Sequence, residues 1–340
     1  MSVTIKDVAK QANVSPSTVS RVISDSNKIS EKTKKRVRKV MEEMGYHINL
    51  NARVLVQKST QTIGIVMKHS ASQTLENPFF PELLRGISAE CNEKEYSILL
   101  TTGNSEEAIF DEVKKLVMGK RVDGIIVIYS KKDDPVVPYL LESGIPFVVI
   151  GKPTKEQNRI MYVDNDNVQA GTDATEYLIN CGHKRICFIG DDPEYQVVQD
   201  RMSGFDIAAR KHELKIPDKH YLTFPMKVDE IAEKKISALL ETKDRPTAII
   251  SSSDVHTLMV ITALRKKEIK IPNEMSIITF NNTIISKLST PPLTSIDIQT
   301  YQLGFEAAKS VIELIKNPEM FRKSVIIPAI IVERESVSKL

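Results

Sequence analysis

The hydrophobic positions near the amino terminus predict three short helices. In the first two, the apolar residues repeat with the i, i+3, i+4, i+7 spacing of a buried face. They are Ile5, Val8, Ala9 and Ala12, followed by Val19, Val22 and Ile23. Ser30 and Glu31 begin a third helix, which Gly45 ends. Its apolar stripe consists of Val37, Val40, Met41 and Met44. We expect these helices to close a small core over residues 1–45.

The second predicted helix leaves a polar face outside that core. Ser15 is placed to cap the helix, and Pro16 suits its first turn because an N–H is not needed there. Ser17, Ser20 and Arg21 then point away from the apolar face. Two short helices joined by a tight turn, the second with an exposed polar face, are typical of a helix-turn-helix that reads a DNA groove.

From residue 62 onward, short apolar runs alternate with amphipathic helical patterns. The strand-like runs are TIGIVM (62–67), SILLTT (97–102), DGIIVIYS (123–130), FVVIG (147–151), ICFIG (186–190), TAIISSS (247–253) and SIITF (276–280). Such alternation predicts parallel sheets covered by helices, here as two doubly wound halves. Ligands in these folds bind outside the carboxyl ends of the strands, so we expect a cleft between the halves.

The charge of the chain is unevenly distributed. Residues 1–60 carry 12 Lys and Arg against 5 Asp and Glu, whereas the remaining residues carry 35 against 39, although the whole chain is only +3. This concentrates attraction for phosphate in the predicted helical module. In the third helix, Lys34, Lys35, Arg38 and Lys39 lie off the apolar stripe, where they form a solvated face or contact phosphates.

The cysteines and the remaining motifs exclude other classes of protein. Cys91, Cys181 and Cys187 are too few for a disulfide framework, and no signal peptide or membrane-spanning run is present. We therefore expect a cytoplasmic protein. The group Cys181, His183 and Cys187 lacks the spacing and the fourth ligand of a zinc site, so no metal is predicted. No catalytic motif is found, which argues against an enzyme.

Polar residues follow several predicted strands, where a cleft would open. Asp164 follows MYV, Ser253 and Asp254 follow TAIIS, Asn281 follows SIITF, and Arg201 begins an amphipathic helix. Together they suit a polyhydroxylated ligand. Each is also a plausible turn or cap residue, and for Asp254 the role of a helix cap is equally favoured. Phe79 and Phe80 could add the aromatic platform that carbohydrate sites use.

The amino-terminal pattern resembles the headpiece of the lactose and galactose repressor family. It is met by Thr-Ile, Asp-Val-Ala, Val-Ser and Thr-Val-Ser-Arg-Val between Thr4 and Val22, and further family signatures are found at 178–186 and 200–205. The resemblance implies a headpiece (1–45), a hinge segment (46–61) and a periplasmic-binding-protein-like body (62–340). The body then has an N-subdomain of about 62–162 and 292–325 and a C-subdomain of about 163–291 and 326–340. Chain crossovers follow near 163, 291 and 326.

The resemblance also implies which side chains contact DNA and effector. The DNA contacts expected from it are Thr4, Ser15, Pro16, Ser17, Ser20, Arg21, Lys28, Thr33, Asn49 and Leu55. Leu55 matches the side chain that the family inserts into the minor groove, although a packing role in the body is the alternative reading. Arg201, Ser253 and Asn281 match effector-binding positions. The family more often has Asn at position 253 and Asp at position 281.

The expected function is that of a homodimeric repressor that leaves a palindromic operator when a small effector fills the cleft. Within the family the chain is most similar to maltose-operon repressors of Gram-positive bacteria, which implies maltose or a related α-glucoside as effector. No cofactor is expected. Two alternatives stay open: a global catabolite regulator co-activated by a phosphorylated carrier protein, and a non-regulatory sugar-binding protein.

Overall fold

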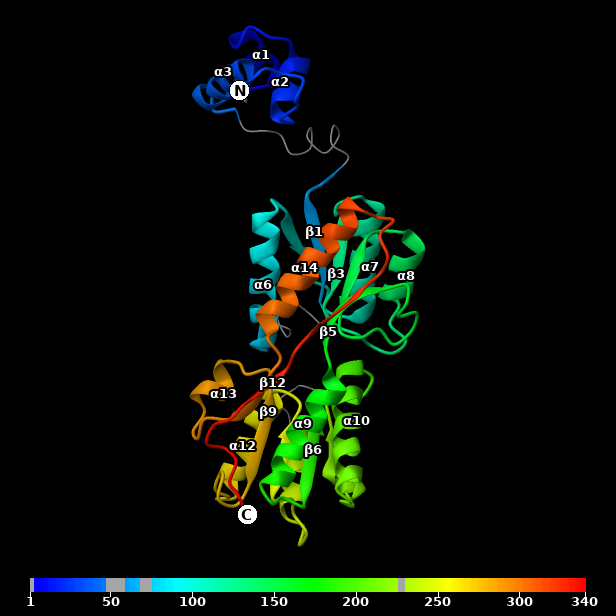
Figure 1. The fold of residues 1–340 in the computed structure, drawn as a ribbon, viewed down its shortest axis with the longest axis vertical. Coiled ribbons are helices and arrows are strands. Elements are labelled where there is room, and N and C mark those ends of the chain that lie inside the picture. Colours follow the sequence, from blue (N-terminus) through cyan, green and yellow to red (C-terminus); the bar gives the residue numbers. More distant parts are fainter. Residues whose placement is uncertain (1–2, 47–58, 68–74, 226–229) are drawn as a thin grey trace. The chain divides into compact units, whose positions relative to one another are not determined.

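Figure 1 shows the computed structural model, which describes residues 3–46, 59–67, 75–225 and 230–340. The chain divides into two compact units, residues 1–60 and residues 61–340. Each unit has a hydrophobic core of its own.

The first unit contains the three helices expected from the apolar pattern. They are α1 (Ile5–Gln11), α2 (Pro16–Ile23) and α3 (Glu31–Glu43). One valine from each helix, Val8, Val19 and Val37, is completely inaccessible to solvent at the centre of this core. Ser15 and Ser30 cap α2 and α3 by accepting hydrogen bonds from the backbone N–H groups of Thr18 and Thr33.

Two of the basic side chains on α3 form ion pairs within this unit, and one of them, Lys34, is buried instead of belonging to a solvated face. Lys34 is only 4% exposed, and its Nζ lies 3.1 Å from Asp25 Oδ1 and 3.0 Å from Glu31 Oε1. Arg38 Nη2 lies 2.6 Å from the same Asp25 oxygen. Asp25 has a φ of 51°, so these ion pairs hold a left-handed residue in the loop between α2 and α3. Lys39 pairs with Glu43 at 3.7 Å on the surface.

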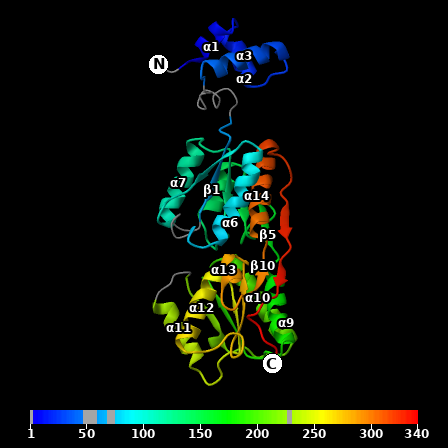
Figure 2. The same ribbon diagram turned by 90° about the vertical axis from the view of Figure 1, so that its left-hand side faces the viewer.

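The described part of the second unit forms two six-stranded sheets, one in each subdomain (Figure 2). The first sheet has the order β11-β5-β4-β3-β1-β2 and is parallel throughout. Its strands are β1 (Thr62–Val66), β2 (Ser97–Leu100), β3 (Gly124–Val127), β4 (Phe147–Ile150), β5 (Met161–Asn165) and β11 (Ser324–Ile327).

The second sheet has the order β12-β10-β9-β8-β6-β7, and only β12 runs antiparallel to its neighbour within the described residues. Its strands are β6 (Ile186–Gly190), β7 (Tyr221–Thr223), β8 (Ala248–Ser251), β9 (Ser276–Phe280), β10 (Thr294–Asp297) and β12 (Ile330–Val332). The expected class of fold, a helical headpiece with two doubly wound parallel sheets, is confirmed.

Helices cover both faces of each sheet. Those of the N-subdomain are α6 (Phe79–Glu93), α7 (Glu106–Met118), α8 (Val136–Ser143) and α14 (Thr300–Lys316). Those of the C-subdomain are α9 (Asn167–Asn180), α10 (Gln196–Lys211), α11 (Glu230–Leu240), α12 (Asp254–Lys266), the short α13 (Ile284–Leu288) and a 3-10 turn (Asp218–His220). In β3, Ile126 packs with residues of α6 and α14, whereas Ile125 and Val127 pack with residues of α7 and α8.

The described chain passes between the subdomains after β5, β10 and β11 (Figure 1). These strands end at Asn165, Asp297 and Ile327, whereas the crossings were expected near 163, 291 and 326. The largest difference, at β10, arises because the polar sequence TSID lacks the apolar pattern of a strand although it pairs with β9 of the C-subdomain.

Two pairs of helices approach each other closely enough to require glycine. A Cβ on Gly304 of α14 would lie 2.1 Å from the carbonyl oxygen of Leu83 in α6. A Cβ on Gly171 of α9 would lie 2.3 Å from the carbonyl oxygen of Arg201 in α10. The two subdomains therefore use the same packing device, and in the C-subdomain it fixes the backbone at Arg201.

Candidate DNA-binding and effector sites

The structure places the expected DNA-reading side chains on the surface of α2. Pro16, Ser17 and Arg21 are exposed, and Ser20 is partly buried. The Ser15 hydroxyl lies 2.8 Å from the Ser17 hydroxyl and accepts from the Thr18 N–H at 3.2 Å. Ser15 therefore fixes the start of α2, and Arg21 is a long cationic side chain on its exposed face.

The other expected DNA contacts surround this helix or lie outside the described residues. Thr4 caps α1 and donates to Asp7 Oδ2 at 2.6 Å, while its side chain stays exposed. Lys28 is exposed in the loop before α3, and Thr33 is partly buried in the first turn of α3. Asn49 and Leu55 belong to the residues that the structure does not describe.

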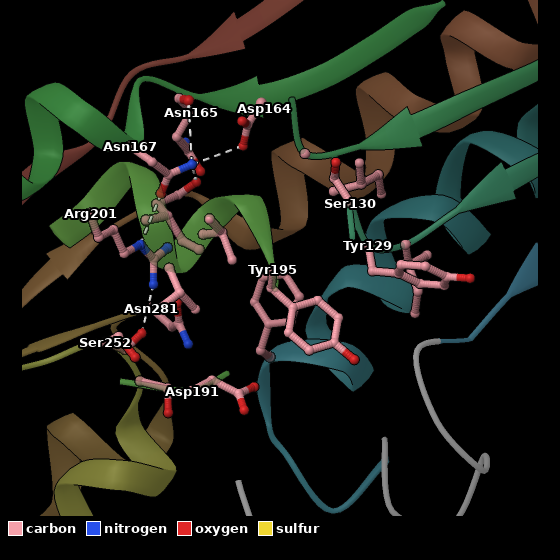
Figure 3. A pocket seen from close by; sticks show the side chains of 18 of the residues that line it. Tyr129, Ser130, Asp164, Asn165, Asn167, Asp191, Tyr195, Arg201, Ser252 and Asn281 are labelled. Atoms are coloured by element: carbon pink, nitrogen blue, oxygen red, sulfur yellow. Dashed lines mark hydrogen bonds between the residues drawn. The ribbon is translucent and has the colours of Figure 1, made fainter. Parts of the chain in front are cut away.

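A cavity of about 130 Å³, lined by both polar and apolar side chains, lies between the two subdomains (Figure 3). It includes six of the seven expected effector residues: Phe79, Phe80, Asp164, Arg201, Ser253 and Asn281. Both subdomains contribute to the cavity, as expected from the strand ends. The other lining residues are Asn77, Ile128, Tyr129, Ser130, Ile150, Gly151, Asn165, Asn167, Asp191, Tyr195, Val197, Val198, Ser252, His256, Ile298 and Leu303.

Arg201 is the cationic centre of the cavity. It lies in the second turn of α10, not at its start, and only 5% of its surface is exposed. Its Nε donates to Asn167 Oδ1 at 2.9 Å, and its Nη1 donates to the Ser252 carbonyl at 2.6 Å. The guanidinium lies 4.1 Å from the centre of the Phe280 ring, a cation–π contact. Burial lowers the pKa of Arg201 to about 10, so the guanidinium stays charged at neutral pH.

Asp164 supplies a negative charge to the same cavity. Burial raises the pKa of Asp164 to about 6, although two backbone N–H groups and the nearby Arg201 oppose this shift. Asp191, 8% exposed, adds a second carboxylate to the lining. The cavity thus combines one guanidinium with two carboxylates and several amides and hydroxyls, a set that can donate and accept many hydrogen bonds.

Ser253 and Asp254 have different roles although they are adjacent. The Ser253 hydroxyl lines the cavity, lies 2.8 Å from His256 Nδ1 and caps α12. Asp254 does not line the cavity, contrary to expectation. It is fully buried, and its carboxylate accepts from Thr279 Oγ1 at 3.0 Å and from Thr283 N and Oγ1 at 3.0 and 2.5 Å. Asp254 therefore ties α12 to the loop before α13.

Contacts between the loop after β3 and the start of α10 join the subdomains beside the cavity. The Gln196 N–H donates to the Ser130 carbonyl at 3.0 Å, and the Lys132 N–H donates to the Glu194 carbonyl at 2.9 Å. The Lys131 ammonium lies 3.2 Å from Glu194 Oε2. In this structure the cavity is consequently bounded on one side by direct contacts between the subdomains.

Sequence reasoning missed several cavity residues. Tyr129, Tyr195 and His256 carry no motif, and they reach the cavity only because the sheets place loop residues distant in sequence beside one another. Asn167 could have been suspected, since it follows Asp164 by three residues in the run Asp-Asn-Asp-Asn.

The motif that suggested zinc has a structural role. His183 Nδ1 lies 3.0 Å from Thr247 Oγ1, and its Nε2 lies 3.1 Å from the Ser338 carbonyl oxygen. Gly182 has a φ of 96° and packs against Leu340. Gly182 and His183 therefore anchor the carboxyl-terminal tail. Among the described side chains, no three of His, Cys, Asp and Glu gather as metal ligands do, and no described helix is long and apolar enough to cross a membrane.

A capped, exposed helix on a basic three-helix unit, followed by two mainly parallel sheets with a cavity of hydrogen-bonding side chains between them, defines a ligand-responsive DNA-binding protein. Two family profiles match the chain: "Bacterial regulatory proteins, lacI family" at residues 4–49 and "Periplasmic binding protein-like domain" at residues 175–337. The chain belongs to the lacI family of bacterial regulatory proteins, and it is a transcriptional regulator and not an enzyme.

Individual relatives resemble the chain over most of its length. The HTH-type transcriptional regulator MalR of Streptococcus pneumoniae serotype 4 is 40% identical over 93% of this chain and 94% of its own. A solved staphylococcal structure, titled as a probable maltose operon transcriptional repressor, is 31% identical, with a TM-score of 0.75 over 82% of this chain and 98% of its own. The lac repressor dimer bound to operator and an anti-inducer, 20% identical, matches 99% of this chain and 100% of its own with a TM-score of 0.85, which supports the fold.

Proposed function

We propose that the protein is a cytoplasmic repressor of carbohydrate-utilisation genes that leaves its operator when an uncharged sugar binds in the cavity. Maltose or a related α-glucoside is the first candidate effector. The observation that carries this proposal is the hydrogen-bonding cavity around Arg201, with Phe79 at its wall, in a chain fused to a DNA-binding headpiece. The name and title of the relatives just described supply the maltose assignment.

The charges of the cavity favour an uncharged ligand. Asp164 and Asp191 line the cavity together with one guanidinium, and with a pKa of about 6 the Asp164 carboxyl is mostly ionised above pH 7. A phosphorylated sugar would bring a further negative charge toward these two carboxylates. A neutral sugar can instead donate its hydroxyls to the carboxylates and accept from Arg201.

The headpiece reads the operator through α2 in this proposal. Pro16, Ser17 and Arg21 face the bases, and Arg21 can hold guanine with two hydrogen bonds. Ser20 and Thr33 lie at or near the phosphate backbone, where Lys28 adds a sequence-independent attraction. The further contacts expected from the family resemblance are Thr4, Ser15, Asn49 and Leu55, with Leu55 inserted between base steps.

A homodimer follows from the palindromic operator expected for this class of regulator. The lac repressor structure is a dimer on its operator. In this chain, Ile284 and Leu288 of α13 are 57% and 74% exposed, and Leu258 of α12 is 41% exposed. We assign the dimer contact of the C-subdomain to these apolar side chains, since their burial between two copies would remove them from water. Sedimentation of Leu288→Asp as a monomer is the expected result, and an unchanged dimer contradicts this assignment.

The alternatives are less well supported. A catabolite regulator co-activated by a phosphorylated carrier protein would need no sugar cavity, and the staphylococcal structure reported above is titled as a probable maltose operon repressor. A non-regulatory sugar-binding protein would not need the exposed helix α2 on a basic unit.

Thermal melting against a panel of neutral sugars and sugar phosphates tests the effector assignment. A ligand at one hundred times its dissociation constant stabilises the folded protein by about 2.7 kcal/mol. We expect this shift with maltose or a related glucoside and not with sugar phosphates. Stabilisation by phosphosugars alone would contradict the proposal.

A further inference from the structure

A chain of hydrogen bonds runs along the cavity from the N-subdomain into the C-subdomain (Figure 3). It begins in the loop between β4 and β5, where the Lys152 N–H donates to Asp164 Oδ2 at 2.9 Å. Asn167 Nδ2 donates to Asp164 Oδ1 at 3.0 Å, and Arg201 Nε donates to Asn167 Oδ1 at 2.9 Å. Arg201 Nη1 then donates to the carbonyl of Ser252, in the loop before α12, at 2.6 Å.

Asn167 is the central link of this chain. It is the first residue of α9 and is 2% exposed. A side-chain amide carries an acceptor and a donor on one planar group, which is what a position between a guanidinium and a carboxylate requires. Alanine at this position would remove one of the hydrogen bonds to Asp164 and the acceptor of the Arg201 Nε, whereas aspartate would bring two carboxylates together.

The contacts of Arg201 leave one side of its guanidinium for a ligand. Nε and Nη1 are engaged, and the ring of Phe280 lies against the guanidinium plane. Nη2 makes no hydrogen bond to any described residue of the chain, and Arg201 lines the cavity. The orientation of this nitrogen is therefore set by the groups that hold Nε and Nη1.

We propose that Asn167 is a positioning residue for the effector: it orients Arg201 toward the ligand and, through Asp164, couples that orientation to the Lys152 loop of the N-subdomain. This inference rests on the proposed function of the cavity. An effector bound to Arg201 would then stabilise one relative arrangement of the subdomains, because the same hydrogen bonds connect the ligand contact to both of them.

The charged groups around this network predict a pH signature for one variant. Asp164 is faced by Arg201 and Asp200 of α10, and burial has already raised its pKa to about 6. In Asn167→Asp, a second carboxylate lies beside the first, so the pair must take up a proton more readily. A protonated carboxyl donates from one oxygen and accepts at the other, as the native amide does. Acid should therefore restore the network in this variant.

Calorimetric titration of the full-length protein with maltose between pH 8 and pH 5.5 tests the inference. We expect Asn167→Asp to bind about tenfold or more weakly at pH 8, the effect of one lost hydrogen bond to a charged group, and to approach the wild type at pH 5.5. Asn167→Ala should be weaker at every pH. The matched control is Asp166→Asn, the reverse exchange at the exposed neighbouring N-cap of α9, which should bind as the wild type does.

A ligand-free measurement separates this inference from the proposed function. The melting temperature of Asn167→Asp should rise relative to that of the wild type as the pH falls from 8 to 5.5, and that of Asp166→Asn should not. Should the wild type bind none of the sugars, the proposed function fails, and the melting profile still decides whether Asn167 holds Arg201 to Asp164. Wild-type affinity and an unchanged melting profile for Asn167→Asp would overturn it. The test depends on the recovery of Asn167→Asp in acid, so it stands even if Asn167→Ala fails to fold.

Discussion

Gly171→Ala should destabilise the protein, although alanine normally stabilises a helix. At an open helical position this substitution adds about 0.5–1 kcal/mol of stability. At Gly171 the new Cβ would lie 2.3 Å from the carbonyl oxygen of Arg201, whereas such atoms normally stay about 3.3 Å or more apart. Helices α9 and α10 must therefore separate by roughly 1 Å, and overpacking of this kind costs about 1–3 kcal/mol.

The expected fall in melting temperature is several degrees, because about 1 kcal/mol corresponds to roughly 2–4 °C for domains of this size. Differential scanning calorimetry measures it, with Gln169→Ala on the exposed face of the same helix as the control. The displaced Arg201 backbone should also weaken effector binding in Gly171→Ala. A melting temperature equal to or above that of the wild type would refute the packing argument.

Other substitutions separate the roles of the headpiece and the carboxyl-terminal tail. Arg21→Ala should cost about 1–3 kcal/mol of operator affinity and relax specificity at one base pair, whereas Lys28→Ala should weaken binding to all operators alike. Fluorescence anisotropy with operators that differ by a single base pair measures both effects. A uniform loss of affinity for Arg21→Ala would contradict base reading by Arg21. Ser336→Ala removes the hydroxyl that pairs with the buried Thr294 N–H and the Ile277 carbonyl, so the free energy of unfolding should fall by about 2–4 kcal/mol. Urea unfolding measures this loss, and an unchanged midpoint would disprove it. Burial lowers the pKa of His183 below 6.5, so the unfolded chain takes up the proton first and stability falls as the pH drops below that value. His183→Gln should reduce the loss of stability between pH 7.5 and pH 5.5, and an equal loss would assign the acid sensitivity to other groups.

The apolar pattern predicted those elements whose burial is strong and periodic. The three headpiece helices and all seven strand-like runs are present, because a run such as GIIV is buried on both faces of a parallel sheet. The strands that escaped prediction are short or polar. Tyr221–Thr223 has three residues. Thr294–Asp297 contains two buried hydroxyl side chains: Ser295 accepts from the Asn282 N–H in the loop after β9, and Thr294 donates to the Arg334 carbonyl in the tail.

The effector site could be predicted only in part from the sequence, because the fold decides which polar residues line the cavity. Arg201 and Asn281 were found because they follow family positions, and Asp164 because it ends a strand. Asp254 follows a strand too, but its carboxylate accepts hydrogen bonds from Thr279 and Thr283, which only the fold brings beside it. Likewise, the basic run on α3 gave no sign that Lys34 would be buried, since its acidic partner Asp25 lies in a preceding loop.

The response of the protein–operator complex to maltose tests the central claim most directly. Fluorescence anisotropy of labelled operator DNA should show that maltose releases the wild-type protein, and that Arg201→Ala binds the operator equally well but is not released. The reason is that a ligand shifts a conformational equilibrium only through its differential affinity for the two states, and Arg201 supplies much of that affinity. Release of Arg201→Ala at the same sugar concentration as the wild type, or no release of the wild type by any neutral sugar, would contradict the account.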